Sequence, residues 1–359
     1  MLKQELTESD VVTRGIIALK DLLAQVPAVT IEKVTEQPVA SGARHDFTAD
    51  VTIFGKPHIL VVEAKSNGQP RFVRNAILQL RDYIAKIGGM ATPLLLAPYL
   101  SPETRALCRE EKISFLDLEG NARIAFDNMF IEHVVPTRPL ADRRGLKSLF
   151  KPKSAQILRV LLRNPWHSWK VKDLAEVAGV STGQVSNIRT ALLDREWATK
   201  TFEGFTLLEP NLLLDTWRDN YEAPAGERLN YYTTKHGLTL ENVSYLSTLG
   251  VEEKHVALAA FSAANWFAPY GRVPTQYFYA DRTGHAQLKD RLNLSTVEKG
   301  ENIVITVLKD RGPLRDTIEA APGINCTGIV QTYLDLWQLG ERGREAAEHL
   351  RQEKLLWPK

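Results

Sequence analysis

Three charged residues stand inside two apolar stretches of the segment HDFTADVTIFGKPHILVVEAKSNG, residues 45–68. Asp50 lies in the first stretch, and Glu63 and Lys65 lie in the second. If the chain turns through residues 55–58, Asp50 faces Glu63 directly across a hairpin, with Cβ atoms about 4.5–5.5 Å apart. Two carboxylates at that distance repel each other, and a divalent cation between them removes the repulsion. The pattern therefore predicts a Mg²⁺ or Mn²⁺ site that is formed by Asp50 and Glu63.

Lys65 is expected on the same face as Glu63, because side chains two residues apart in a strand point to one side. An ammonium group in that position can orient an attacking water or neutralise charge that develops on a phosphodiester. A bound metal would act there as a Lewis acid and lower the pKa of its water ligand. The alternative is an ion triad of Asp50, Glu63 and Lys65 that is partly buried in the sheet and has no catalytic chemistry.

An acid, a hairpin and then the pattern Glu-x-Lys on the next strand resemble the PD-(D/E)xK nuclease superfamily. The helix that follows contains QLRDY, in which Gln79 and Tyr83 are four residues apart, and this pair is similar to the Q-x-x-x-Y signature of RecB-like members. Ala49 stands where the family often has proline, and no glutamate of the first helix is assigned from the sequence. The resemblance covers the first 90 to 130 residues and implies a restriction-endonuclease-like core for a domain of residues 1–135.

The resemblance also implies a role for each matching residue. Asp50 and Glu63 would bind the metal, and Lys65 would orient the water. Gln79 and Tyr83 would position the DNA strand. Together these residues would form a metal-dependent endonuclease site.

The elements that must position these residues follow an α-β-β-β-α-β order. Helical periodicity marks residues 11–26, 70–89 and 101–112, whereas apolar or alternating runs mark strands at 29–35, in the hairpin, at 91–100 and within 113–126. This order predicts a mixed sheet with helices packed on it. The whole chain is therefore expected to be a multidomain α/β and α+β protein.

A basic stretch, residues 136–153, is expected to link the first domain to the next. It contains one acid, Asp142, against six cations: Arg138, Arg143, Arg144, Lys147, Lys151 and Lys153. Such a run is either a solvated connector or a segment that lies along a phosphate backbone.

Residues 154–208 resemble a winged helix-turn-helix. Within AEVAGVSTGQVSNIRTAL, Gly179 marks the turn, Ser181 is an N-cap, and Val185, Ile188 and Leu192 recur at helical spacing. The side chains expected to face double-stranded DNA are Ser181, Thr182, Gln184, Ser186, Asn187 and Arg189. Backbone contacts are expected from Lys170, Lys172 and Lys200. The alternative is a winged helix that is used for protein contacts.

The last block, residues 209–359, is expected to be an α+β domain. Its segments 262–280 and 328–350 resemble AbiEi-type antitoxin and regulator proteins, as does the earlier segment 97–124. The resemblance implies a bacterial regulator that binds promoter or operator DNA. It also leaves room for a protein partner that binds the C-terminal domain.

Composition excludes several classes of protein. The net charge of +2 is too small to indicate a nucleic-acid partner by itself. Two distant cysteines and eight scattered histidines show no zinc spacing and no disulfide framework. The longest apolar run, residues 256–268, is too short to span a bilayer, and the N-terminus has no signal-peptide pattern. We therefore expect a cytoplasmic protein without a membrane partner.

Two main functions follow from these patterns. One is a Mg²⁺-dependent DNA nuclease that its own winged helix directs to DNA. The other is a non-catalytic transcriptional regulator or antitoxin in which the nuclease-like domain is a scaffold. A component of a larger defence machine is a third possibility, and a homodimer that matches a palindromic site remains open.

Overall fold

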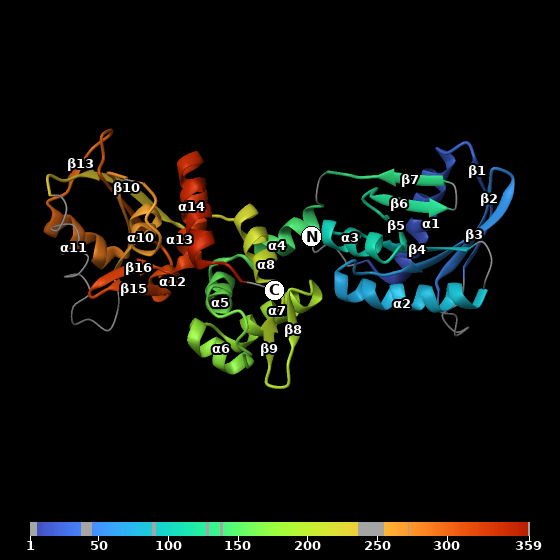
Figure 1. Cartoon of the computed structure of the whole chain (residues 1–359), viewed down its shortest axis with the longest axis horizontal. Helices are drawn as coiled ribbons and strands as arrows, with labels where there is room; N and C mark the ends of the chain where they lie inside the picture. Colours follow the sequence, from blue (N-terminus) through green and yellow to red (C-terminus); the bar gives the residue numbers. More distant parts are fainter. Residues whose placement is uncertain are drawn as a thin grey trace. The chain divides into compact units, whose positions relative to one another are not determined.

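The computed structural model describes residues 6–36, 45–87, 91–126, 129–136, 139–235, 255–271 and 273–357. The chain divides into two compact units, residues 1–144 with 193–196 and residues 145–192 with 197–359. Both units combine helices with a β-sheet, so the predicted mixture of α and β structure is confirmed (Figure 1).

The first unit contains a seven-stranded sheet in which the strands follow the order of the sequence. The first three strands are antiparallel: β1 (Val29–Glu36), β2 (Phe47–Ile53) and β3 (Lys56–Ala64). Two strands then join parallel to β3, namely β4 (Ala91–Ala97) and β5 (Ser114–Asp117). The sheet ends with the antiparallel strands β6 (Ala122–Phe126) and β7 (Met129–His133).

Helices cover both faces of this sheet (Figure 1). Helix α1 (Glu8–Ala24) packs on one face through Val11, Leu19 and Leu23. The opposite face is covered by α2 (Pro70–Ile87) and α3 (Pro102–Glu110). Buried strand residues therefore face a helix on either side, which leaves β3 and β4 as the centre of the core.

Helix α1 lies unusually close to β4 at Gly15. A Cβ atom added to Gly15 would lie 2.0 Å from Cδ2 of Leu96. Glycine therefore allows an approach that a larger residue would block.

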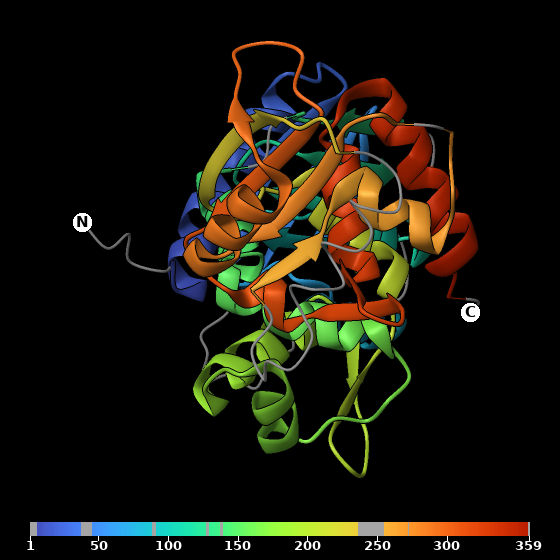
Figure 2. The ribbon, with the colours of Figure 1, turned by 90° about the vertical axis from the view of Figure 1, so that its left-hand side faces the viewer.

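Three helices and a two-stranded hairpin open the second unit: α5 (Pro152–Arg163), α6 (Val171–Ala178), α7 (Thr182–Asp194), β8 (Ala198–Lys200) and β9 (Phe205–Leu207). We call these five elements the helix–hairpin module. Figure 2 shows the hairpin extending away from the helices at the bottom of the view.

The segment expected to be a basic linker includes a helix, α4 (Leu140–Leu149). Leu146 and Leu149 are buried, and the ring of Phe150 stacks on Trp217 with their centroids 5.7 Å apart. Trp217 belongs to α8 (Pro210–Asp219), which follows the hairpin. Arg138 lies outside the described residues.

A second seven-stranded sheet has the order β13-β10-β14-β12-β11-β16-β15. Its strands are β10 (Gly226–Tyr232), β11 (Val256–Leu258), β12 (Gln276–Ala280), β13 (Ser295–Thr296), β14 (Ile303–Leu308), β15 (Thr317–Ala321) and β16 (Ile324–Thr327). The helices of this region are α10 (Ala260–Phe267), α11 (Arg282–Leu292), α12 (Gly312–Arg315), α13 (Ile329–Trp337) and α14 (Gly340–Lys354). Within the described part of the chain, no helix has both the length and the apolar character to cross a membrane.

Candidate functional site

The hairpin of β2 and β3 turns earlier than the sequence predicted. Ile53 pairs with Lys56, so the turn consists of Phe54 and Gly55, with φ values of +45° and +77°. A two-residue turn with both residues in the left-handed region matches the twist of the flanking strands. Gly55 adopts this conformation easily, whereas Phe54 rarely does, and this explains why the pattern misplaced the turn.

The predicted pairing of Asp50 with Glu63 is therefore wrong. Asp50 pairs with Ile59 on β3 and with Lys33 on β1. Glu63 lies four residues farther along β3 than Ile59, which corresponds to about 13 Å in a strand. Asp50 and Glu63 consequently cannot share one metal ion in this arrangement.

Asp46 takes the place that the sequence analysis gave to Asp50. The observed register, continued by one residue beyond Phe47, sets Asp46 opposite Glu63. The backbone N–H of Asp46 donates to the carbonyl of Val62 at 2.9 Å, and its Oδ2 accepts the N–H of Ala64 at 2.6 Å. The Asp46 carboxylate is therefore held beside the Glu-x-Lys strand.

Lys65 lies between two further carboxylates. Its Nζ donates to Oε1 of Glu63 at 2.6 Å and lies 3.7 Å from Oε1 of Glu8, in the first turn of α1. Glu8, Asp46, Glu63 and Lys65 thus form what we call the carboxylate–lysine cluster. The sequence analysis missed Glu8 and Asp46, although a correct turn would have indicated Asp46.

Burial changes the acidity of the cluster. Glu63 is only 6% exposed, and this burial raises its pKa to about 7. The hydrogen bond from Lys65 acts in the opposite direction, while the nearby charges of Asp46 and Glu8 raise the pKa further. Glu63 can therefore gain or lose a proton near neutral pH, a property that clusters at functional sites.

Tyr83 and Gln79 lie differently with respect to this cluster. The ring of Tyr83 packs against His45, with centroids 4.1 Å apart, and His45 directly precedes Asp46. His45 is buried, and neither of its ring nitrogens has a hydrogen-bond partner among the described residues. Gln79 is exposed on α2. The structure therefore connects Tyr83 to the cluster through His45.

The described residues contain no group of three or more His, Cys, Asp or Glu side chains that could hold a metal ion. Mg²⁺ needs fewer, because it is often held by one or two carboxylates together with water and substrate phosphate. Asp46 and Glu63 each have a second carboxylate oxygen beyond the one in the hydrogen bond described above. These oxygen donors fit a hard divalent cation in chemical type.

In the second unit, the sequence around Gly179 produces a tight turn between α6 and α7. Gly179 has φ of +63° and closes α6 through its N–H to the carbonyl of Glu176 at 3.1 Å. Ser181 then caps α7, because its Oγ accepts the N–H of Gln184 at 3.2 Å. Val185, Ile188 and Leu192 are buried. The polar side chains of α7 are thereby turned away from this core.

The predicted DNA-facing residues differ in exposure. The exposed ones are Ser181, Thr182, Asn187, Lys170, Lys172 and Lys200. The half-buried ones are Gln184, Ser186 and Arg189. Gln184 donates to Oγ of Ser154 at 3.0 Å, and Nε of Arg189 is buried. Asn187 and Thr182 are therefore better placed than Arg189 to reach a ligand without rearrangement.

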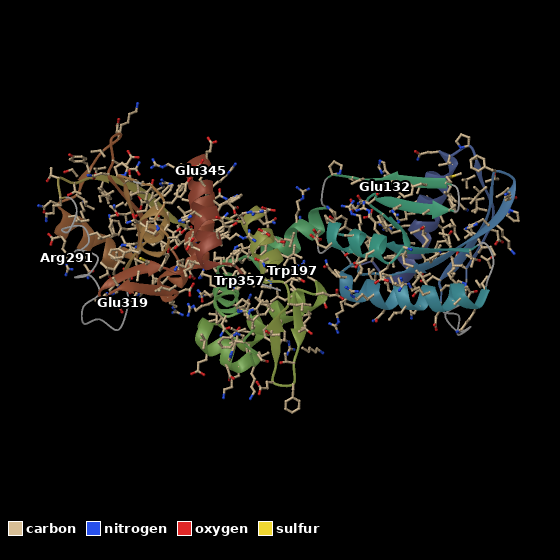
Figure 3. The ribbon with its side chains drawn as sticks, viewed as in Figure 1. Glu132, Trp197, Arg291, Glu319, Glu345 and Trp357 are labelled. Atoms are coloured by element: carbon tan, nitrogen blue, oxygen red, sulfur yellow. The ribbon has the colours of Figure 1, made fainter. Side chains whose placement is uncertain are left out.

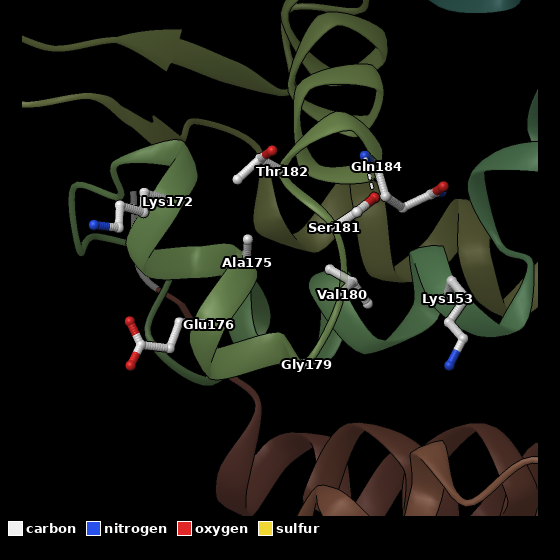
Figure 4. Close-up of a pocket in the computed structure, with 9 residues that line it drawn as sticks. All are labelled: Lys153, Lys172, Ala175, Glu176, Gly179, Val180, Ser181, Thr182 and Gln184. Atoms are coloured by element: carbon white, nitrogen blue, oxygen red, sulfur yellow. Dashed lines mark hydrogen bonds between the residues drawn. The ribbon is translucent and has the colours of Figure 1, made fainter.

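A hollow of about 660 Å³ lies beside the start of α7 (Figure 4). Lys172 and Lys153 stand on opposite sides of it, and Thr182 and Gln184 lie along its α7 edge. Glu176 is the one acid among the nine lining residues. Cationic groups that flank a polar helix start suit a phosphate-bearing ligand.

The hairpin of the module is tightly held. Gly204 donates to Oγ1 of Thr201 at 2.9 Å, and a Cβ at Gly204 would lie 2.1 Å from the carbonyl oxygen of Trp169. Trp197, which directly precedes β8 (Figure 3), is buried and accepts the N–H of Leu208 at 2.8 Å through its carbonyl.

Phe202 lies in the connection between β8 and β9 and is fully exposed. The hairpin therefore presents an aromatic ring to solvent from a rigid tip.

Comparison with known proteins gives one match. No curated protein and no solved structure matches the chain. Residues 206–356, less than half of the chain, match the family model described as transcriptional regulator, AbiEi antitoxin, type IV TA system. This match supports the resemblance that the sequence showed for the C-terminal block.

Proposed function

We propose that the protein is a DNA-binding transcriptional regulator of the AbiEi type that acts in the bacterial cytoplasm. The match of residues 206–356 to a regulator family carries this proposal. The helix–hairpin module, whose last strand overlaps the start of that region, supplies the DNA contact. Its α7 would enter the major groove, and its hairpin would act as a wing.

The exposed face of α7 supports this role. Thr182 and Asn187 offer a hydroxyl and an amide, which can donate to and accept from base edges. Lys153 and Lys172 flank the hollow beside the start of this helix, where phosphates would lie. Base contacts and phosphate contacts would therefore come from adjacent parts of one module.

The test is a footprint of the full chain on the DNA that precedes its own gene. We expect protection of a defined site, and we expect the Asn187→Ala variant to lose about tenfold in affinity for that site. The exposed Lys289→Ala variant on α11 is the matched control and should bind as the wild type does. The length of the protected DNA also reveals whether one chain or a pair binds. Equal binding to all DNA by wild type and Asn187→Ala would exclude sequence recognition through α7.

The carboxylate–lysine cluster supports a second function, the metal-dependent cleavage of phosphodiesters. Asp46 and Glu63 would hold Mg²⁺ or Mn²⁺, and the ion would supply Lewis-acid activation of water. Lys65, 2.6 Å from Glu63, would position the water or neutralise charge on the phosphate. Asp50 takes no part in this version of the site, because the β2–β3 register sets it opposite Ile59.

Supercoiled plasmid tests the second function. The full chain is incubated with Mg²⁺, with Mn²⁺ and with EDTA, and nicked and linear products are measured. Nicking that requires metal and disappears in Lys65→Ala supports the cleavage site. Absence of nicking with either metal, in a preparation that still protects its DNA site, leaves the regulator as the function of the chain.

A further inference from the structure

The second unit contains a partly open cavity of about 180 Å³ beside α5 of the helix–hairpin module. Its wall includes Ala155 and Arg159 of α5, Trp217 of α8, Gln331 of α13, and Tyr221 from the segment after α8. Phe150 adds a second ring, stacked on Trp217 with an interplanar angle of 4°. We call this space the α5–α13 cavity. Its volume equals that of about six water molecules, which suits a single ring with a short polar group.

Arg159 is the buried charged residue of this wall, with 3% of its surface exposed. Its Nη1 donates to Oε1 of Gln331 at 3.0 Å, and its Nε lies 3.2 Å from Oδ2 of Asp316. Its Nη2 has no hydrogen-bond partner among the residues that the structure describes. A buried guanidinium N–H without an acceptor is unfavourable. The burial also lowers the pKa of Arg159 to about 10.

Most of the neighbouring polar atoms are engaged with one another, whereas Oδ2 of Asp335 and Oε1 of Gln156 are buried without a hydrogen-bond partner among the described residues. Nε2 of Gln331 donates hydrogen bonds to the hydroxyl of Tyr221 at 2.7 Å and to Oδ1 of Asp335 at 2.9 Å. Tyr221 donates to the same Asp335 oxygen at 2.5 Å. Gln331 and Tyr221 therefore leave Arg159 with an unmet demand for an acceptor. An oxygen atom of a ligand in the cavity would supply the acceptor that Nη2 of Arg159 lacks.

Charge at the cavity favours an anionic acceptor. The N-terminal end of α5, Lys151 and Pro152, lines the space, and a helix start attracts negative charge. Two acids also line it, but Glu222 pairs with Lys147 at 2.8 Å and Asp310 with Lys153 at 3.4 Å. A carboxylate on the ligand would make a charge-assisted hydrogen bond to the guanidinium, roughly twice as strong as a neutral one.

We propose that the α5–α13 cavity binds a small aromatic carboxylate, whose acid group accepts from Arg159 and whose ring lies against Phe150 and Trp217. The cavity is bounded by α5, the first helix of the module, and by segments of the C-terminal region. Asp316 pairs with both Arg159 and Arg163 of α5, and Asp310 accepts from Gln156 of α5 at 3.3 Å. A ligand that draws Arg159 toward itself changes these contacts and thereby the position of the module. Control of DNA affinity rests on the proposed regulator function, whereas ligand binding itself does not.

Isothermal titration of the full chain, without DNA, tests the binding step. The probes are benzoate, salicylate and phenylacetate, with benzyl alcohol as the uncharged molecule of similar size. We expect saturable binding of at least one carboxylate, and affinity for benzyl alcohol at least about tenfold lower. If none of the three carboxylates binds saturably, the proposal is overturned.

Variants locate the site. Arg159→Gln should weaken carboxylate binding about tenfold or more while leaving the weak binding of benzyl alcohol unchanged. Because a change at a buried arginine can impair folding, Ala155→Leu provides a second test: its larger side chain fills the cavity and should abolish binding. Thr306→Val, which lies in a neighbouring cavity that Arg159 does not line, is the control and should bind as wild type does. Binding that persists in Ala155→Leu would place the ligand elsewhere and refute the assignment.

Discussion

The two candidate sites of this protein hold their polar groups in opposite ways. In the carboxylate–lysine cluster, Glu63 and Lys65 are largely removed from water and are fixed to each other at 2.6 Å. On α7 of the helix–hairpin module, Thr182 and Asn187 are exposed. Buried charges oppose folding unless they are paired, whereas exposed hydroxyls and amides retain their hydration. The cluster is therefore organised without a ligand, whereas the α7 face would gain partners only if it binds DNA as proposed.

The largest expected effect tests whether the cluster is a metal-dependent site at all. If plasmid nicking is observed, Asp46→Asn should lower its rate about a thousandfold, because activation by a metal is worth several kcal/mol. Asp50→Asn is the matched control, since Asp50 lies opposite Ile59, and its nicking rate should stay unchanged. Gel densitometry of nicked product measures both rates. Equal losses in the two variants would refute the role that the register assigns to Asp46.

The next prediction concerns how strongly burial raises the pKa of Glu63 in the cluster. The pKa of Glu63 is about 7 in the folded protein, above its ordinary value of 4.5, so protonation favours the folded state. Its stabilising contribution is complete below pH 4.5 and is lost as the pH rises through 7. Relative to Glu63→Gln, the wild type should lose about 3 kcal/mol of unfolding free energy across this range. Denaturant titrations at a series of pH values measure the difference. Parallel pH profiles would show that Glu63 is solvated.

A smaller effect is expected at the edge of the α7 site. Lys172→Ala should weaken DNA binding several-fold for every sequence and reduce the slope of log affinity against log salt by about one. Lys289→Ala on α11 should leave the slope unchanged. Fluorescence anisotropy at several salt concentrations gives both slopes. A loss of sequence preference in Lys172→Ala, in place of a uniform loss, would assign this lysine to base recognition.

The smallest effect concerns the tip of the hairpin. Phe202→Ala should lower DNA affinity a few-fold, because an exposed apolar side chain can wedge into a groove. Phe202→Leu should retain most of that affinity. Thermal unfolding should be the same in both variants, since the Phe202 ring is exposed and is not buried against any of the residues that the structure describes. A drop in thermal stability would indicate that Phe202 has a structural role and does not serve as a contact.

Much of the fold could be predicted from local pattern. Gly179, with φ of +63°, and Ser181, with its cap to Gln184, were both indicated by residue type at a helix junction. Val185, Ile188 and Leu192 are buried, as their spacing predicted. These features follow from short-range physical chemistry, in which the glycine conformation, the N-cap and the helical period act within a few residues.

The composition of the carboxylate–lysine cluster could not be predicted in the same way. The register depended on one turn, and Phe54 occupies a left-handed conformation that its side chain disfavours. The misplaced turn shifted the predicted pairing of β2 with β3 by four positions. Asp50 was therefore predicted to lie opposite Glu63, where the structure has Asp46. Glu8 reaches Lys65 only through the packing of α1 on the sheet, a contact between residues that are 57 positions apart in sequence. Such a contact depends on tertiary structure and leaves no local signal.

The absent side chain at Gly15 has a consequence for engineering this unit. Any methyl group there would force Leu96 to turn aside or push α1 outward from β4. Since Glu8 is carried by the first turn of α1, the outward step would lengthen its 3.7 Å reach to Lys65 without altering a single charge. A substitution at position 15, about two helical turns from Glu8, could therefore change the distance between Glu8 and Lys65 without altering any charged residue.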